Sequence, residues 1–340
     1  MKKPHGKHPV PVSQLRQDIV SGDWIVVATS RAKRAGAFIQ ERRETPDPKP
    51  TCPFENPQAA GNPEPLLWFG ETRKDWTLQV IPNKYPAFGP GNCKARKGEG
   101  PYIEMDGSGF HEVIITRDHE KSLAEFSQAP AIEVLKAYRD RYRALMNEPC
   151  VRYIFIFHNH GRESGATISH PHSQLVAMPV IPGDVARSLG GAERYFSEKG
   201  SCVHCAMIDW ERRRKARVIF ENRSYIAYAP YASRTVFEVR VFPKKHEPRF
   251  EETSDQALPL LADALRLTLK KISAALKNPA YNFFIHTAPA ENPEEYPYYH
   301  WHIEILPKIT VWGAVEIGTG IEIITISPED AAAFLRTGRA

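Results

Sequence analysis

The sequence is poor in cysteine and has no long apolar run. Its five cysteines are too few, and odd in number, for a disulfide framework, so Cys93 and Cys150 are expected to be unpaired. No stretch of 18 apolar residues occurs, and the first five residues do not lead into the apolar core of a signal peptide. These absences argue against membrane-spanning and secreted proteins, and we expect a cytoplasmic location.

A strong charge imbalance is absent as well. The 45 basic and 40 acidic residues leave a formal net charge of +5, which suits small anionic substrates as well as nucleic acid. The basic runs 212–215 and 270–271 are short and fit solvated helix faces. We expect a globular protein with no nucleic-acid or membrane partner, and a zinc-stapled nucleic-acid binder is the distant alternative. The length allows two ordinary domains or one large pseudo-symmetric domain.

What the chain does have is a compact histidine motif, His170-Pro171-His172-Ser173-Gln174. In extended backbone His170, His172 and Gln174 point to the same side. A neutral imidazole can attack phosphorus through one ring nitrogen when the other donates its proton to a fixed acceptor, and the Gln174 amide could donate to a phosphate oxygen in the transition state. The motif indicates phosphoryl transfer with a histidine nucleophile. For His-Pro-His alone, two inert histidines on a half-buried strand are the alternative.

The segment just before this motif favours anion binding. Residues 159–167 read Asn-His-Gly-Arg-Glu-Ser-Gly-Ala-Thr, which supplies glycines, hydroxyls and exposed backbone amides. A phosphate group is therefore expected to bind close to the two histidines.

The chain also contains an internal repeat. Each half has cysteine, then a single histidine, a helical segment, an apolar strand and a His-x-His pair. His119 and His170 are 51 residues apart, and His246 and His300 are 54 apart. We predict an α+β fold made of two tandem copies of one unit, each an antiparallel sheet with a long helix on one face. The expected domains are 1–185, carrying the nucleophile, and 186–340, with the junction inside 180–201.

The main elements follow from apolar periodicity. Three- and four-residue spacing predicts helices at 129–146 and 255–276, the second capped by Ser254. Alternation and β-branched residues predict strands at 24–27, 112–116, 152–157, 236–241, 281–286 and 303–305. Proline and glycine place loops at 45–65 and 88–101.

The second half supplies a set of zinc ligands: Cys202, Cys205, His246 and His300. Two thiolates and two imidazoles form a closed tetrahedral site, which implies a structural metal. The ligands spread over about a hundred residues, unlike those of a nucleic-acid zinc finger. A chance pair of buried thiols is the alternative for Cys202 and Cys205 alone.

The first half has the corresponding set Cys52, Glu55, His119 and His170. Here a glutamate stands where the second cysteine would be, so this zinc site is expected to be harder and weaker, and its occupancy is open.

Five further histidines have no assigned role. His158, His160 and His204 are expected at the surface or in loops, and His111 and His286 at strand ends.

The chain resembles the galactose-1-phosphate uridylyltransferases, a family of the histidine-triad superfamily. The resemblance covers nearly the whole sequence, and its marks are Gly22-Asp23-Trp24, Arg31 to Arg34, Cys52-Pro53-Phe54, Asn83 to Phe88, Asp118-His119, Asn159 to Gln174, Cys202 to Cys205, Pro243 to His246, and Tyr299-His300-Trp301-His302. It implies a tandem pair of histidine-triad-like units related by a pseudo-two-fold axis, and a homodimer that binds a nucleotide sugar and a sugar 1-phosphate.

The resemblance also implies roles for individual residues. His172 would attack the α-phosphorus in a ping-pong reaction, with Gln174 as the donor to the charged oxygen. The remaining positions would bind substrate: Asn83 and Asn159 the nucleotide, Gly165 and Thr167 the phosphates, Arg31 and Arg34 phosphate in the neighbouring subunit, and Glu316 the sugar hydroxyls. In the second copy Ile303-Glu304 replaces Ser-Gln after His302, so one active centre per chain is expected.

The resemblance leaves the substrate open between two branches. Exchange of UMP between UDP-glucose and galactose 1-phosphate is the leading expectation. Residues 317–320 (Ile-Gly-Thr-Gly), the serine of His-Pro-His-Ser-Gln and the C-x-x-C pair are more similar to the ADP-glucose phosphorylases, which transfer an adenylyl group to phosphate. Hydrolysis or phosphorolysis of dinucleoside polyphosphates is a further possibility, and no residue distinguishes uracil from adenine.

Overall fold

The computed structural model of the protein describes residues 12–29 and 47–338. Its strands are β1 (Gln14–Gln17), β2 (Trp24–Val27), β3 (Leu67–Gly70), β4 (Trp76–Pro82), β5 (Arg96–Lys97), β6 (Ile103–Glu104), β7 (Phe110–Thr116), β8 (Tyr153–His160), β9 (His172–Met178), β10 (Val218–Glu221), β11 (Tyr225–Tyr228), β12 (Val239–Pro243), β13 (Tyr281–His286), β14 (His302–Pro307) and β15 (Ile323–Ile324). Its α-helices are α1 (Gln128–Leu145), α2 (Gly183–Lys199), α3 (Val203–Arg214), α4 (Leu258–Leu276), α5 (Ala314–Thr319) and α6 (Pro328–Thr337).

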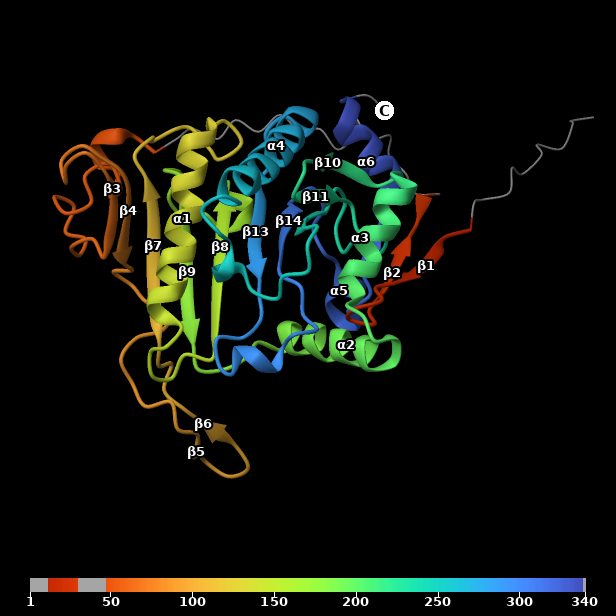
Figure 1. Cartoon of the computed structure of the whole chain (residues 1–340). Helices are drawn as coiled ribbons and strands as arrows, with labels where there is room; N and C mark the ends of the chain where they lie inside the picture. Colours follow the sequence, from red (N-terminus) through yellow and green to blue (C-terminus); the bar gives the residue numbers. More distant parts are fainter. Residues whose placement is uncertain (1–11, 30–46, 339–340) are drawn as a thin grey trace, which may run out of the picture.

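A ten-stranded antiparallel sheet spans both halves of the sequence (Figure 1). Its order is β10-β11-β12-β14-β13-β8-β9-β7-β4-β3. The first half contributes β3, β4, β7, β9 and β8, and the second half contributes β10, β11, β12, β14 and β13 in the corresponding order. The predicted tandem α+β fold is therefore confirmed, and the two copies join through β8 and β13.

The pairing registers show the pseudo-two-fold relation between the copies. Phe157 of β8 pairs with Phe284 of β13. Phe157 also pairs with Gln174 of β9, and Phe284 pairs with Glu304 of β14. The β8–β13 junction therefore lies at the axis, and Gln174 and Glu304 occupy equivalent positions.

One face of this sheet is covered by α1 and α4, which pack against each other (Figure 1). The helices bury residues such as Leu135 and Tyr138 of α1 and Leu265 of α4, together with alternate strand residues such as Ile114 and Leu175. Because side chains alternate along a strand, His172 and Gln174 point to the opposite face from Leu175. The apolar core thus fixes which residues of β9 are left for chemistry.

Two elements begin three residues later than predicted, for local reasons. Helix α4 begins at Leu258, three residues later than expected, and Ala257 rather than Ser254 is the residue before its first turn. Ser254 Oγ accepts the N–H of Ala257 in the preceding turn, and Pro259 is the second residue of the helix. Strand β12 begins at Val239 because Phe237 has a φ of 65°, outside the β region.

The structure also contains a separate, three-stranded sheet with the order β1-β2-β15. The hairpin of β1 and β2 pairs antiparallel, and β15 adds to β2 in parallel. This sheet brings the N-terminal part of the described chain against residues near the C-terminus. Within the described residues, none of the helices is long and apolar enough to span a bilayer.

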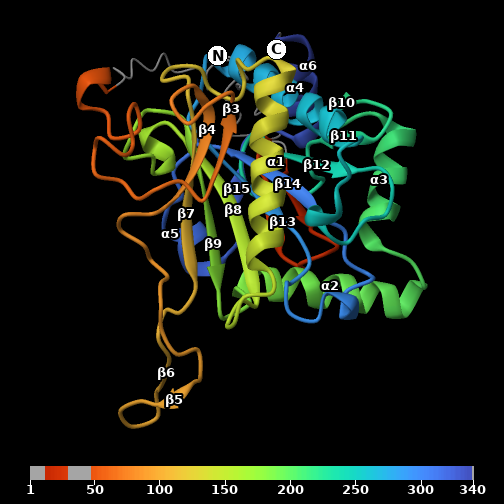
Figure 2. The same ribbon diagram turned by 60° about the vertical axis from the view of Figure 1, so that its left-hand side comes forward.

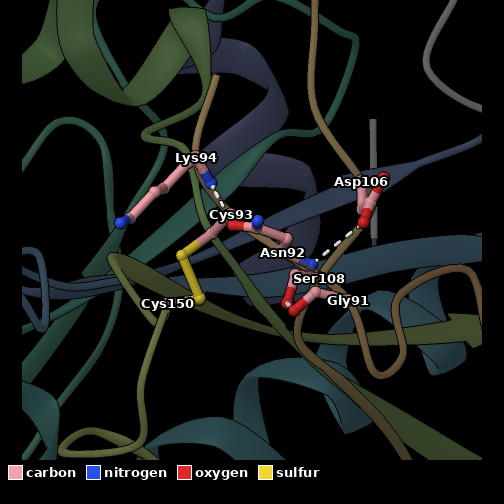
Figure 3. The surroundings of a disulfide bond; sticks show 7 residues. All are labelled: Gly91, Asn92, Cys93, Lys94, Asp106, Ser108 and Cys150. Carbon is pink, nitrogen blue, oxygen red and sulfur yellow. Dashed lines mark hydrogen bonds between the residues drawn. A yellow bond between two sulfur atoms is a disulfide. The ribbon is translucent and has the colours of Figure 1, made fainter. Parts of the chain in front are cut away.

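The expectation that Cys93 and Cys150 are unpaired is wrong, because the two form a disulfide (Figure 3). They are 57 residues apart in sequence, yet their Cα atoms are 5.6 Å apart. Cys93 lies in the long connection between β4 and β7, which carries the projecting β5–β6 hairpin (Figures 1 and 2), and Cys150 follows α1. The spacing alone could not reveal a contact that depends on the path of this connection.

Candidate functional site

The predicted nucleophile His172 begins β9, between β7 and β8. Its side chain is only 8% exposed, and its Nδ1–H donates to the carbonyl of His170 at 2.9 Å. The ring of Phe54 packs edge-on against it, with 5.0 Å between centroids. Burial lowers the pKa of His172, which favours the neutral ring. With the proton held on Nδ1, the lone pair of Nε2 is available for attack on an electrophile.

Gln174 lies on the same face as His172, two residues along β9. Its Oε1 accepts the Nε2–H of His111 at 2.7 Å. Asn83 is adjacent, since its Nδ2 lies 3.1 Å from His111 Nε2. A cavity of about 840 Å³ lies next to these residues, and its lining includes Asn83, His111 and Cys150. This volume is within the size range of small-molecule sites.

The predicted anion-binding segment forms a tight turn after β8. Gly165 has a φ of 93°, a conformation that favours glycine, and both Gly165 and Thr167 are exposed. A side chain added at Gly165 would lie 3.7 Å from Asn159 Nδ2, so the amide of Asn159 faces this turn. Asn159 Oδ1 accepts a hydrogen bond from Asn282 Nδ2 at 2.7 Å. The second copy therefore orients a candidate binding residue of the first.

The four predicted ligands of the second metal site converge. Donor atoms of Cys202, Cys205, His246 and His300 all lie within 4.8 Å of one another. Cys205 Sγ is 3.5 Å from Nδ1 of both His246 and His300. The Nε2–H of His246 donates to the carbonyl of Pro297, and that of His300 donates to the carbonyl of Pro243. These bonds leave both Nδ1 atoms unprotonated toward the centre, which fits zinc.

The first metal site has the same construction. Cys52, His119 and His170 bring their donor atoms together, with Cys52 Sγ 3.6 Å from His170 Nδ1. Both Nε2–H groups donate to backbone carbonyls, of Asp47 and Thr116. Glu55 completes the set, because its Oε2 lies 3.2 Å from His119 Nδ1 and is buried without a hydrogen-bond partner. An orphaned carboxylate oxygen facing an unprotonated imidazole is what a cation between them would satisfy.

The electrostatics of both sites suit a metal. Burial lowers the pKa of His170 to about 4, so this imidazole is neutral and able to coordinate near pH 7. The hydrogen bond from the Cys205 thiol lowers the pKa of Cys202, so one thiolate forms readily in the second set. The two donor sets are therefore consistent with zinc sites.

The second copy does not repeat the side-chain arrangement of the first. Arg240 stands opposite Glu304, where the first copy has Val113 opposite Gln174. Arg240 pairs with Glu304 and also with Asp18, which comes from the turn of the β1–β2 hairpin. The remaining cavity, lined among others by His302, is only about 60 Å³. His286, His302 and Glu304 also cluster, but Arg240 already shares that carboxylate.

Arg31 and Arg34 lie outside the described residues. Glu316 lies on α5, where its Oε2 accepts the N–H of Gly313 at the start of the same helix.

Two of the histidines expected at the surface are buried. His158 is 2% exposed and its Nδ1 lies 2.9 Å from Ser173 Oγ on the face toward α1. His204 is 1% exposed and packs near His302. Each packs against aromatic side chains, His158 against Phe283 and His204 against Phe242, and the spacing of residues along the sequence does not show such contacts. His160 is half-buried at the end of β8, and His286 ends β13 as expected.

Two residues of the site, His111 and Asn282, had no role predicted from the sequence. His111 had no assigned role, although its place on the alternating strand β7 puts it on the same face as Gln174. Asn282 is a polar residue within an otherwise apolar strand, and that was the available signal.

Solved structures show the class of protein. An ADP-glucose phosphorylase from Arabidopsis thaliana, with bound ADP-glucose, superimposes with a TM-score of 0.82 at 31% identity, covering 96% of this chain and 99% of that chain. A uridylyltransferase structure shares the fold, with a TM-score of 0.73 at 24% identity over 96% of this chain and 98% of that one. The fold and the His-x-His site define a nucleotidyltransferase of histidine-triad type.

Sequence comparison gives the family. Residues 7–182 match the N-terminal domain of galactose-1-phosphate uridyl transferase, and residues 189–332 match its C-terminal domain. An ADP-glucose phosphorylase of Arabidopsis thaliana is 34% identical over 95% of this chain and 92% of its own length. A galactose-1-phosphate uridylyltransferase of Thermotoga maritima is 27% identical over 95% and 98%. This chain belongs to the galactose-1-phosphate uridyl transferase family and is an enzyme of its nucleotidyltransferase type.

Proposed function

We propose that this enzyme is an ADP-sugar phosphorylase, which transfers an adenylyl group from ADP-glucose to phosphate through His172. The observation that carries the chemistry is the buried His172, because burial lowers its pKa and its Nδ1–H donates to the carbonyl of His170. The choice of adenylyl donor rests on the ADP-glucose phosphorylase relative, at 34% identity over nearly the full length of both chains. This proposal gives preference to the adenylyl donor, whereas the leading expectation from the sequence is the uridylyl donor.

In the first step, His172 Nε2 attacks the α-phosphorus of ADP-glucose. The bond from that phosphorus to the bridging oxygen breaks, and glucose 1-phosphate leaves with the electron pair. The ring becomes an adenylyl-imidazolium, whose Nδ1 proton stays hydrogen-bonded to the carbonyl of His170. Gln174 donates an amide N–H to the charged oxygen that develops on phosphorus.

In the second step, an oxygen of inorganic phosphate attacks the same phosphorus from the side that glucose 1-phosphate has left. The P–N bond breaks, its electrons return to Nε2, and ADP forms. Because the phosphoramidate retains much of the free energy of the pyrophosphate bond, the exchange is reversible. Asn83 and Asn159 would bind the nucleotide, and Gly165 and Thr167 the phosphates.

The metal sites hold this arrangement in place. His170 would coordinate zinc with Cys52, Glu55 and His119, while its own carbonyl accepts the Nδ1–H of His172. A zinc ion there would fix the backbone that sets the tautomer of the nucleophile. Zinc on Cys202, Cys205, His246 and His300 would staple the second copy, and neither ion takes part in the transfer.

Intact mass spectrometry of the enzyme mixed with ADP-glucose or UDP-glucose tests the proposal. An adenylyl adduct that disappears when phosphate is added is the expected result. His172→Asn should form no adduct, whereas His302→Asn, the matching change in the second copy, should form it normally. Absence of any adduct on the wild-type enzyme with both donors would overturn the proposal.

The second candidate is exchange of UMP between UDP-glucose and galactose 1-phosphate. The uridylyltransferase relative from Thermotoga maritima favours it, because it covers almost all of both chains. The same experiment separates the two functions, since a uridylyl adduct discharged by galactose 1-phosphate and not by phosphate identifies this one.

The units and assembly are proposed to follow the repeat. We place the boundary between the copies at residues 185 and 186, inside α2, with one sheet continuous across both. A homodimer would supply Arg31 and Arg34 to the neighbouring site. Exposed apolar side chains around α5, among them Val311 and Ile317, support a contact with another subunit.

A further inference from the structure

We propose that His111 is a positioning residue that orients the Gln174 side chain for nucleotidyl transfer. The inference rests on the proposed function, since it concerns how Gln174 meets the phosphate. It adds one residue, and one hydrogen-bonded chain of three groups, to what the sequence motif contains.

The first link fixes the tautomer of His111. The backbone N–H of Ala87 donates to His111 Nδ1 at 3.1 Å. Nδ1 must therefore be the unprotonated nitrogen of the neutral ring, and Nε2 carries the hydrogen. A backbone N–H can only donate, so this hydrogen bond decides which group donates and which accepts at every later hydrogen bond of the series.

The second link passes that direction to Gln174. His111 Nε2 lies 2.7 Å from Gln174 Oε1, a good distance for a donated hydrogen bond. Asn83 Nδ2 also lies near Nε2, but Asn83 Oδ1 accepts the N–H of Tyr85 at 2.9 Å, which leaves its NH₂ group toward His111. Two donors cannot bond to each other, so the hydrogen on Nε2 goes to Gln174.

The third step is the orientation of the Gln174 amide. With Oε1 held by His111, the NH₂ group is the free end and can donate to phosphate. If the amide rotated by half a turn, its oxygen lone pairs would face the phosphate and repel it. The His111 bond therefore favours the donor orientation before substrate arrives, and such preorganisation is what makes a donor to a developing charge effective.

The connection that carries Ala87 is itself held in place. It runs from β4 toward Cys93, whose disulfide with Cys150 ties it to the end of α1 (Figure 3). The second copy lacks this relay, because Arg240 bonds the carboxylate of Glu304 at the position equivalent to Gln174. The relay thus occurs only in the copy that carries the proposed nucleophile.

The experiment is a double-mutant cycle on the rate of adduct formation in a single turnover at saturating donor. His111→Phe keeps the ring and loses the hydrogen bond, and we expect it to slow the reaction about 10- to 100-fold. His111→Gln can donate from a similar position and should restore most of the rate. In a Gln174→Ala background, His111→Phe should cause no further loss.

Each result bears on the proposal separately from the function. If the wild-type enzyme forms no adduct, the proposed function fails. If it does, and His111→Phe is as fast as wild type, or slows Gln174→Ala as much as it slows wild type, the positioning role fails. A loss of donor affinity at an unchanged saturated rate would also overturn it. Thermal unfolding of each variant identifies a simple loss of folded protein, and the His111→Gln variant then still decides the outcome.

Discussion

Two of the residue differences between the copies lie at one pair of facing strand positions. In the first copy Val113 faces Gln174, and in the second Arg240 faces Glu304. The neutral pair leaves an amide free to donate, whereas the charged pair bonds internally and to Asp18. The carboxylate of Glu304 is already paired with Arg240, so we expect nucleotidyl transfer in the first copy and not in the second.

Gln174→Glu should therefore inactivate the first copy. A carboxylate beside His172 would repel the donor phosphate and could not donate a hydrogen bond. We expect adduct formation to fall by about 10³-fold or more, and further than for Gln174→Ala, which removes the donor without adding charge. Quenched-flow mass spectrometry of both variants measures the difference, and equal rates would contradict the electrostatic argument.

Glu251 is expected to make stability depend on pH. It is 3% exposed, its Oε1 has no hydrogen-bond partner, and burial raises its pKa to about 7. The folded state binds this proton more tightly than the unfolded chain, so its stabilisation is complete below about pH 4.5 and is lost as the pH rises to about 7. Glu251→Gln cannot ionise and should be more stable than wild type at pH 8 by up to about 3 kcal/mol.

Urea unfolding at pH 5 and pH 8, with zinc held constant, checks this prediction. The difference between variant and wild type should be small at pH 5 and large at pH 8. A difference that does not change with pH would show that Glu251 is ionised in the folded protein at both values.

The sequence predicted those residues of the site that lie close together along the chain or recur at matching spacings in the two halves. His170, His172 and Gln174 share a face because they alternate along the chain, and the paired spacings predicted the cysteines and histidines whose donor atoms converge. His111 and Asn282 come from other strands. Their contacts depend on strand order and register, which no local pattern specifies.

At the scale of elements, the second metal set joins three separated pieces of chain. Cys202 and Cys205 lie at the start of α3, His246 follows β12, and His300 precedes β14. A four-ligand zinc ion there should stabilise their packing. We expect two zinc ions per chain, with the ion at Glu55 released first by a chelator. Elemental analysis during the titration measures this order.

Cys205→Ser provides the control for the zinc prediction. It should remove about one zinc per chain and lower the unfolding temperature, while adduct formation persists at low temperature because the set lies in the other copy. Unchanged metal content would contradict the proposed ligand set.

The Cys93–Cys150 disulfide should stabilise the long connection between β4 and β7. It closes a loop of 57 residues, and links of this kind typically contribute about 2–4 kcal/mol. The double variant Cys93→Ser/Cys150→Ser should lose about that much free energy of unfolding. Reductant should lower the stability of wild type to the level of the variant and leave the variant unchanged, and equal stability without reductant would contradict the prediction.

Element types were easier to predict than element ends. Apolar periodicity identified α1, α4 and the central strands, because each must present one apolar face to the core. The start of β12 depends on the φ of Phe237, and the start of α4 depends on the turn that precedes Pro259. Such features arise from the way the chain enters the element, which periodicity does not record.

At the scale of the whole molecule, the proposed dimer predicts that two inactive variants can restore activity when they form a mixed dimer. If Arg31 and Arg34 act in the neighbouring site, a subunit with His172→Asn and a subunit with Arg31→Ala/Arg34→Ala fail for different reasons. In a mixed dimer, the second subunit's intact His172 would meet the first subunit's intact arginines, and one of the two sites would be complete. Co-expression should therefore restore up to about half of the activity of a wild-type dimer, from two inactive parents.

Differently tagged subunits allow the mixed dimer to be purified in two affinity steps and assayed for adduct formation. The matched control is a mixed dimer of a His172→Asn subunit and a Gln174→Ala subunit. Both substituted residues lie on β9 and would act in the site of their own subunit. There the Gln174→Ala subunit keeps its own low rate, so mixing should add nothing to it. If the arginine pair also regains nothing, each site uses the arginines of its own chain, and the dimer would not be needed to complete it.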